Sequence, residues 1–138
     1  MASIPQSING VTVRHANSAN LNVEQALLTA LQHCIKKDIA KGFTLSQIYI
    51  SSANDSHKFP SRHVQGKGKA VDISRINGKK MSVSYGTDKE VTAIVDAMQQ
   101  KFESAPGRRE NFGPSTKKKL GSAHSVSGHK DHIHFSVN

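Results

Sequence analysis

The side chains best suited to hold a metal or move a proton fall in two segments far apart along the chain. His63 and Asp72 lie near the middle, whereas Asp131, His132 and His134 lie close to the end. A catalytic zinc site takes three nitrogen or oxygen ligands from the protein and leaves one position for water. For these residues to act together, the fold must bring the last segment of the chain beside its middle.

The chain has 138 residues, which is the size of one domain, and we expect residues 1–138 to fold as a single unit. A chain of this length can bury a hydrophobic core without a disulfide. Cys34 is its one cysteine and falls in an apolar helical pattern, so an internal disulfide is excluded and a buried, unreactive thiol is predicted.

The first half of the sequence predicts a strand, a helix and a second strand. Val11–Val13 is a short β-rich run. Asn22 and Gln25 form a capping-box pattern ahead of apolar residues spaced by three and four, and Gly42 is a natural stop, so a helix is predicted between them. Leu45–Ser51 reads as a buried strand, and the polar residues 52–69 as a loop.

The second half predicts a hairpin, a helix and a final strand. Asn77-Gly78 is a strong turn signal between predicted strands at 69–75 and 79–84. Thr87 and Glu90 form another capping box, which opens a helix that ends before Pro106-Gly107. Residues 107–130 read mainly as loop and 131–137 as the last strand. The fold class predicted is α+β, a small, mostly antiparallel sheet with helices packed on one face.

The formal net charge of +9 favours an anionic partner, either nucleic acid or a polymer of the cell envelope. Tryptophan is absent, aromatic residues are few and no nucleic-acid-binding motif occurs, which argues against specific nucleic-acid recognition. Lys117–Lys119 reads as a solvated loop. No segment approaches the ~20 apolar residues of a membrane span, and residues 1–9 lack the pattern of a secretory signal. We therefore expect synthesis in the cytoplasm, action elsewhere only after release by another route, no membrane insertion, and a monomer.

The terminal histidines and Asp72 each have an ordinary and a chemical interpretation. His132 and His134 are two residues apart on a predicted strand, so both side chains point to one face. They are either two exposed polar residues or two metal ligands. Asp72 lies between Val71 and Ile73, where aspartate is uncommon. A metal would explain its position.

Asp131 and His132 suggest the remaining parts of a hydrolytic site. A carboxylate such as that of Asp131, three residues before His134, can take a proton from a metal-bound water and deliver it to a leaving amine. His132 can instead stabilise an oxyanion as charge develops.

Three segments together resemble a known enzyme family. Ser61-x-His63, then Gly68-x-Ala70-x-Asp72-Ile73, then Asp131-x-x-His134-Phe135 are similar to the motifs of the zinc D-Ala-D-Ala carboxypeptidase and L-alanyl-D-glutamate endopeptidase family. The resemblance covers roughly residues 45–76 and 128–137. It implies a Hedgehog/DD-peptidase fold and a zinc metallopeptidase that cuts peptides of bacterial peptidoglycan.

The resemblance also implies a role for each matching residue. His63, Asp72 and His134 would bind Zn²⁺, Asp131 would be the catalytic acid and base, and His132 would assist. Ser61 would contact substrate. Eight residues, 64–71, separate His63 from Asp72, a longer interval than the family's usual one, so His57 is a second candidate for the first ligand. Many members of the family carry an arginine for a substrate carboxylate just after the strand that precedes the histidine. The stretch after the strand at 45–51 has none, and Arg62 or a lysine of the inserted segment, Lys67 or Lys69, is the candidate to replace it.

Three functions follow as hypotheses. The first is a peptidase of peptidoglycan stem peptides or cross-links, of the kind that bacteriophages use as lytic enzymes. The second is a non-catalytic zinc-binding module of the same fold that recognises wall peptides, and the third is a basic nucleic-acid-binding domain. The sequence leaves open which peptidoglycan bond the first would cut.

Overall fold

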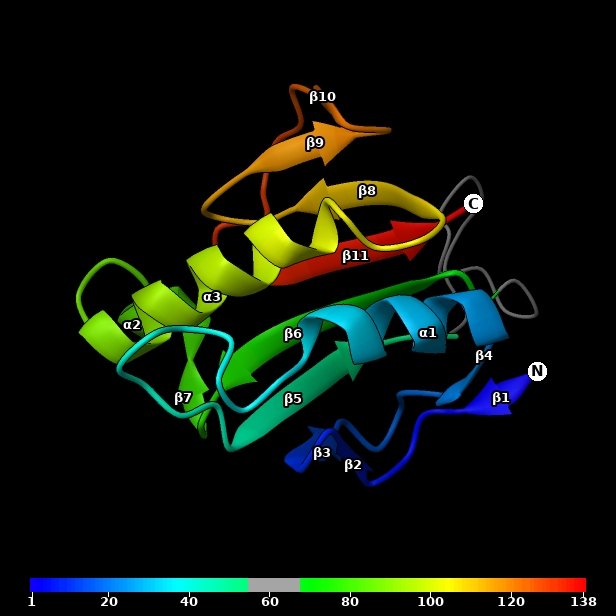
Figure 1. Cartoon of the computed structure of the whole chain (residues 1–138), viewed down its shortest axis with the longest axis horizontal. Helices are drawn as coiled ribbons and strands as arrows, with labels where there is room; N and C mark the ends of the chain where they lie inside the picture. Colours follow the sequence, from blue (N-terminus) through cyan, green and yellow to red (C-terminus); the bar gives the residue numbers. More distant parts are fainter. Residues whose placement is uncertain (55–67) are drawn as a thin grey trace.

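A computed structural model describes residues 1–54 and 68–138 of the chain. These residues form an α+β fold with a mostly antiparallel multi-strand sheet (Figure 1). The described residues form three helices, α1 (Gln25–Cys34), α2 (Met81–Ser84) and α3 (Lys89–Phe102). Their strands are β1 (Ala2–Ser3), β2 (Ser7–Ile8), β3 (Val11–His15), β4 (Asn22–Val23), β5 (Gln47–Ser52), β6 (Ala70–Ile76), β7 (Lys79–Lys80), β8 (Arg108–Phe112), β9 (Lys117–Lys119), β10 (Ser122–Ala123) and β11 (Ile133–Val137).

The main sheet has nine strands in the order β10-β9-β8-β11-β6-β5-β3-β2, with β7 paired to β6. Its strand pairs are antiparallel except for β3 and β5, which run parallel. The last strand, β11, therefore lies between β6 from the middle of the chain and β8. This topology brings the C-terminal segment beside the central one, as a shared site at Asp72 and His134 requires.

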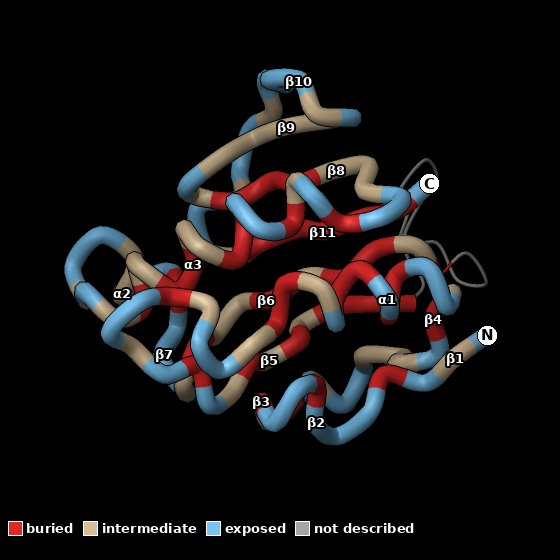
Figure 2. Tube along the Cα trace, viewed as in Figure 1, coloured by how far each residue is buried: buried red, intermediate tan, exposed pale blue. Residues whose placement is uncertain are grey.

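Helices α1 and α3 pack on the same face of the sheet (Figure 1). Beneath them, Val71, Ile73, Ile133 and Phe135 are fully buried, and the ring of Phe135 stacks on that of Phe102 with centroids 4.0 Å apart. Figure 2 shows that β11 is buried along its length. Successive strand residues point to opposite faces, so Asp72 and His134 lie on the face that these helices leave open. We call this the open face of the sheet.

Both long helices form, but α1 ends at Cys34, well before the stop predicted at Gly42, and the caps of both helices differ from the prediction. Asn22 belongs to β4, and Glu24 precedes α1 without a side-chain cap, so the first capping box is not formed. For α3 the cap is Asp88 rather than Thr87, because the Asp88 carboxylate accepts a hydrogen bond from the backbone N–H of Val91. The inner face of α3 consists of apolar residues spaced by three and four, all of them buried: Val91, Ile94, Val95, Met98 and Phe102.

The hairpin at Asn77-Gly78 is confirmed, with positive φ angles of 51° and 78° at the two turn residues. The predicted third strand at 79–84 is wrong beyond Lys80. Met81 turns into the core and is 1% exposed, and the backbone N–H of Tyr85 donates to its carbonyl, which closes the helical turn α2.

The predicted loop at 107–130 is also wrong in large part, because it contains β8, β9 and β10. Lys117–Lys119, expected as a solvated loop, forms β9 and pairs with Glu110–Phe112. Cys34 is buried as predicted, and burial raises the pKa of its thiol to about 12, which leaves it unreactive at neutral pH. Among the helices of the described ranges, none has the length and apolar character to cross a membrane.

Candidate functional site

His134 lies between two carboxylates on the open face of the sheet. It is the direct antiparallel partner of Asp72 on β6, and its Nδ1 lies 3.0 Å from an oxygen of Asp72. On its other side, its Nε2 lies 3.0 Å from an oxygen of Glu110 on β8. The imidazole therefore has a carboxylate at each ring nitrogen.

Glu110 is held in place by more than this one contact. Its carboxylate also accepts a hydrogen bond of 2.9 Å from the hydroxyl of Ser136, and its backbone N–H donates to that same hydroxyl at 3.0 Å. Ser136 is fully buried and follows His134 by two residues on β11. One strand thus supplies both the histidine and the residue that fixes the histidine's partner.

These contacts shift the pKa values of both groups. Burial alone would lower the pKa of His134, but the hydrogen bonds to Asp72 and Glu110 outweigh it and raise that pKa to about 9. The hydrogen bond from His134 lowers the pKa of Glu110 to about 2 in spite of burial. With no metal present, the arrangement therefore favours an imidazolium at His134 beside an ionised Glu110 carboxylate.

Asp131 and His132 lie just before β11 rather than on it, so the expectation that they belong to the final strand is wrong. They still reach the site. His132 Nδ1 lies 2.8 Å from the Asp131 carboxylate, and His132 Nε2 lies 3.9 Å from the Asp72 carboxylate. The hydrogen bond from His132 lowers the pKa of Asp131, whose side chain is 66% exposed, so this carboxylate is ionised and open to solvent.

Aromatic rings form a wall beside His134. Phe112 on β8 stacks on His134 with ring centroids 5.7 Å apart and on His124 at 5.6 Å. His129 meets Phe112 edge-on at 5.3 Å and lies 4.8 Å from the ring of His132. Desolvation first, and then the neighbouring histidines, lower the pKa of His129, which favours its neutral form. His124 and His129, which read as loop residues in the sequence, thus belong to this wall.

The structure brings together four of the seven site residues that the sequence predicts: Asp72, Asp131, His132 and His134. The other three, Ser61, Arg62 and His63, lie outside the described residues, as does the alternative ligand His57. Glu110 and Phe112 are not among these seven residues. The sequence left open whether residues 110–114 line the cleft or form a plain turn, and in the structure Glu110 and Phe112 both contact His134.

Within residues 1–54 and 68–138, no group of three or more His, Cys, Asp or Glu side chains is arranged to hold a metal ion. Asp72 and His134 supply two donor atoms, 3.0 Å apart. Two donors of a tetrahedral zinc site are separated by roughly 3.3 Å, given bonds of about 2.0–2.1 Å. An imidazole and a carboxylate suit zinc. A hydrogen bond from the far ring nitrogen to a carboxylate, as from His134 to Glu110, commonly accompanies a zinc-binding histidine. Asp72 and His134 therefore suit two of the three protein ligands that a catalytic zinc site needs.

Comparisons of the chain with protein-family models, with curated proteins and with solved structures found no match.

Proposed function

We propose that this protein is a zinc-dependent peptidase that hydrolyses amide bonds in peptidoglycan stem peptides or their cross-links. The observation that carries the proposal is the pair formed by Asp72 and His134, with Nδ1 and carboxylate oxygen 3.0 Å apart on neighbouring strands of an open sheet face. His132 connects this pair to a second carboxylate, Asp131, which is ionised and exposed to solvent. The motif resemblance adds the family: a Hedgehog/DD-peptidase fold that acts on wall peptides.

Zinc would be held by His63, Asp72 and His134, and when bound it would supply a water of lowered pKa and a Lewis acid for the substrate carbonyl. The contacts of the neighbouring residues support a role for each of them in the reaction. Glu110 accepts the Nε2–H of His134, which directs the Nδ1 lone pair toward Asp72 and the metal position.

Asp131 is suited to move the proton. Its pKa is lowered by the hydrogen bond from His132, so it is ready as a base at neutral pH, and its exposed position lets it reach both water and leaving amine. In the imidazolium form of His132, Nδ1–H donates to Asp131. Its Nε2–H then remains for the oxygen that gains negative charge during attack on the amide.

The positive charge of the chain suits a polyanionic cell envelope. We further propose action at the bacterial wall as a bacteriophage lytic enzyme. The bond cut would be one of three amides: L-Ala–D-Glu, D-Ala–diaminopimelate or terminal D-Ala–D-Ala.

The test is digestion of purified peptidoglycan with and without a chelator, with the released fragments identified by mass spectrometry. We expect peptide fragments that disappear with chelator and return when zinc is added. Asp131→Ala should abolish hydrolysis while zinc stays bound, and Asp38→Ala, an exposed carboxylate elsewhere, should change neither. A wild-type protein that binds zinc but releases no fragment would instead favour the non-catalytic binding module.

A further inference from the structure

A row of cationic and aromatic side chains crosses the open face of the sheet. Arg14 on β3 is the register partner of Tyr49 on β5, Tyr49 is the partner of Arg75 on β6, and Arg75 is the partner of Lys80 on β7. Directly paired residues point to the same face, so the four form one cross-strand row. The guanidinium of Arg75 lies over the Tyr49 ring, with Cζ 4.2 Å from the ring centre, a cation–π contact.

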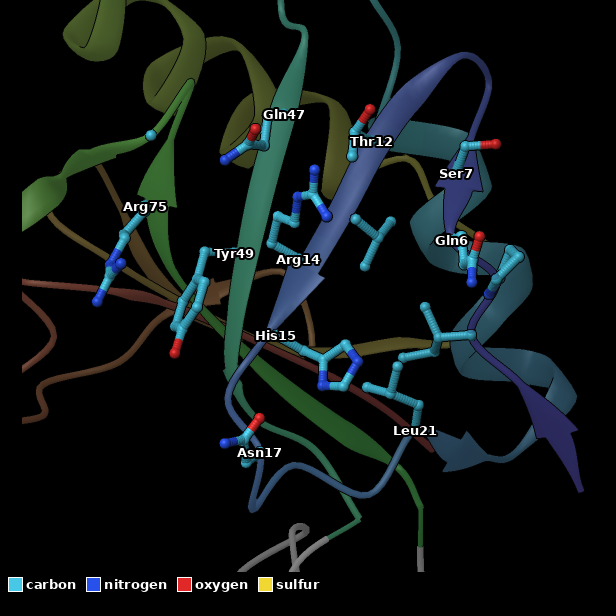
Figure 3. Close-up of a pocket in the computed structure, with 14 residues that line it drawn as sticks. Gln6, Ser7, Thr12, Arg14, His15, Asn17, Leu21, Gln47, Tyr49 and Arg75 are labelled. Carbon is cyan, nitrogen blue, oxygen red and sulfur yellow. The ribbon is translucent and has the colours of Figure 1, made fainter.

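Three members of the row line a groove of about 860 Å³ on this face. Figure 3 shows Arg14, Tyr49 and Arg75 on adjacent strands, with Thr12 and Gln47 also labelled along the groove. The other residues that line the groove are a mixture of polar and apolar side chains, and no described aspartate or glutamate is among them. The groove is thus large enough for a small ligand, polar, and positively charged.

The row has positive charge that the described part of the protein does not neutralise. In residues 1–54 and 68–138, neither Arg14 nor Arg75 forms an ion pair with a carboxylate; the pairs of lysine and arginine there involve Lys79 and Arg108. Like charges directly opposite on neighbouring strands, such as Arg75 and Lys80, destabilise a sheet. A bound anion would offset that cost.

We propose that this groove binds the carboxylates of an acidic peptide. The identity of that peptide rests on the proposed function: it is the part of the stem peptide that lies remote from the bond that is cut. Arg75 follows Asp72 by three residues on β6, roughly 10 Å along the strand. A register shift in the β5–β6 pairing between Tyr49 and Ile50 leaves one extra residue on β6, so Arg75 and Asp72 share the open face. An extended peptide covers that distance with about three residues. A peptide whose amide lies at Asp72 and His134 can therefore reach the row with a carboxylate.

A carboxylate ligand fits this row better than a nucleic acid does. The planar guanidinium fork pairs with carboxylates through two parallel hydrogen bonds. Single-stranded nucleic acid is held largely by stacking of bases on aromatic rings. Here Tyr49 is the one aromatic ring of the row, and Arg75 already covers one of its faces.

The experiment is calorimetric titration of the full chain, with chelator present to prevent turnover, using a synthetic stem peptide with its carboxylates intact. The control ligand is the same peptide with its carboxylates converted to carboxamides. We expect Arg14→Gln and Arg75→Gln each to weaken binding of the acidic peptide about tenfold, the effect of one charged hydrogen bond. Neither should alter binding of the carboxamide peptide. Lys101→Gln, an exposed lysine on helix α3, should leave both unchanged.

Equal binding of the acidic peptide by wild type and both arginine variants would overturn this inference, as would a single-stranded oligonucleotide that binds more tightly with the same arginine dependence. Circular dichroism checks that the variants fold, and Arg75→Lys, which keeps the charge, should restore part of the affinity. A chain that hydrolyses peptidoglycan with unchanged KM in both variants would refute the groove and leave the proposed function intact. Arginine-dependent peptide binding without hydrolysis would refute the function and support the groove.

Discussion

Glu110 accepts a hydrogen bond from Nε2 of His134 at 3.0 Å, on the side of the ring opposite to Asp72. Without a metal, each carboxylate calls for a proton on the ring nitrogen that it faces, and the ring is an imidazolium. With a metal between Nδ1 and Asp72, Glu110 would keep the proton on Nε2 and leave the Nδ1 lone pair for the metal. A structural ion pair needs both protons, whereas a metal site requires this one tautomer.

Glu110→Gln should therefore weaken zinc binding about 10–100-fold, the usual effect of removing the carboxylate partner of a zinc-binding histidine. Competition with a chromophoric chelator measures the affinity, and ¹⁵N NMR of the histidine rings reports the tautomer directly. Glu24→Gln is the control, since that side chain makes no capping hydrogen bond at the start of α1. Zinc affinity unchanged by Glu110→Gln would show that Glu110 only stabilises the fold.

His132→Ala should lower kcat about 100-fold or more while zinc remains bound, because the imidazole holds Asp131 and, in the proposed mechanism, stabilises the oxygen that gains negative charge. Steady-state kinetics on a wall peptide gives kcat, and metal analysis gives the zinc content. His33→Ala is the matched control, as His33 contacts Ser104 at the protein surface. Loss of zinc in the His132 variant would mean that His132 is a ligand rather than a catalytic group.

Local patterns in the sequence were enough to predict the elements that build the core. Apolar residues at helical spacing predicted both long helices, and Asn77-Gly78 predicted the hairpin that follows Asp72. The caps were misassigned by a few residues, because several hydrogen-bonding side chains stand near each helix start and only tertiary packing selects among them. The strand predicted at 79–84 ends at Lys80 for a similar reason, because the burial of Met81 in the core turns the backbone into α2.

The site was harder to predict, because it depends on pairing between distant strands. Asp72 and His134 could be singled out from their residue types and motif, but their direct register cannot be read from either segment alone. Glu110 and Phe112 lie on β8, whose sequence Arg-Arg-Glu-Asn-Phe has no alternation of apolar and polar residues. Only the contact of β8 with β11 reveals that this segment is a strand and that its side chains reach His134.

In the metal-free protein, the charged triad should make stability depend on pH in two ranges. His134 has a folded pKa of about 9 against 6.5, so its contribution is complete below pH 6.5 and is lost as pH rises through about 9. Glu110 has a folded pKa of about 2 against 4.5, so its contribution is present above pH 4.5 and is lost as pH falls toward about 2. Urea unfolding with chelator across this range measures both losses. In His134→Gln the alkaline loss should disappear; a wild-type midpoint that stays constant between pH 6.5 and 9 would contradict the triad.

Asn77 ties the hairpin beside the site to two other parts of the fold. Its side-chain carbonyl accepts hydrogen bonds from the backbone N–H groups of Ser46 and Gln47, and its amide donates to the carbonyl of Thr44 and to Glu90 on α3. Asn77 also has a positive φ of 51°, a conformation that asparagine tolerates better than most residues.

Asn77→Ala should lower the free energy of unfolding by about 2–4 kcal/mol, because it removes these hydrogen bonds and places an alanine in the left-handed region. Asn77→Gly loses the same hydrogen bonds but adopts that backbone without strain, so it should be more stable than the alanine variant by up to roughly 1 kcal/mol. Asn17→Ala, an exposed asparagine, is the control. Urea denaturation of the four proteins gives the ranking, and an alanine variant as stable as the glycine one would show that backbone strain at the turn is negligible.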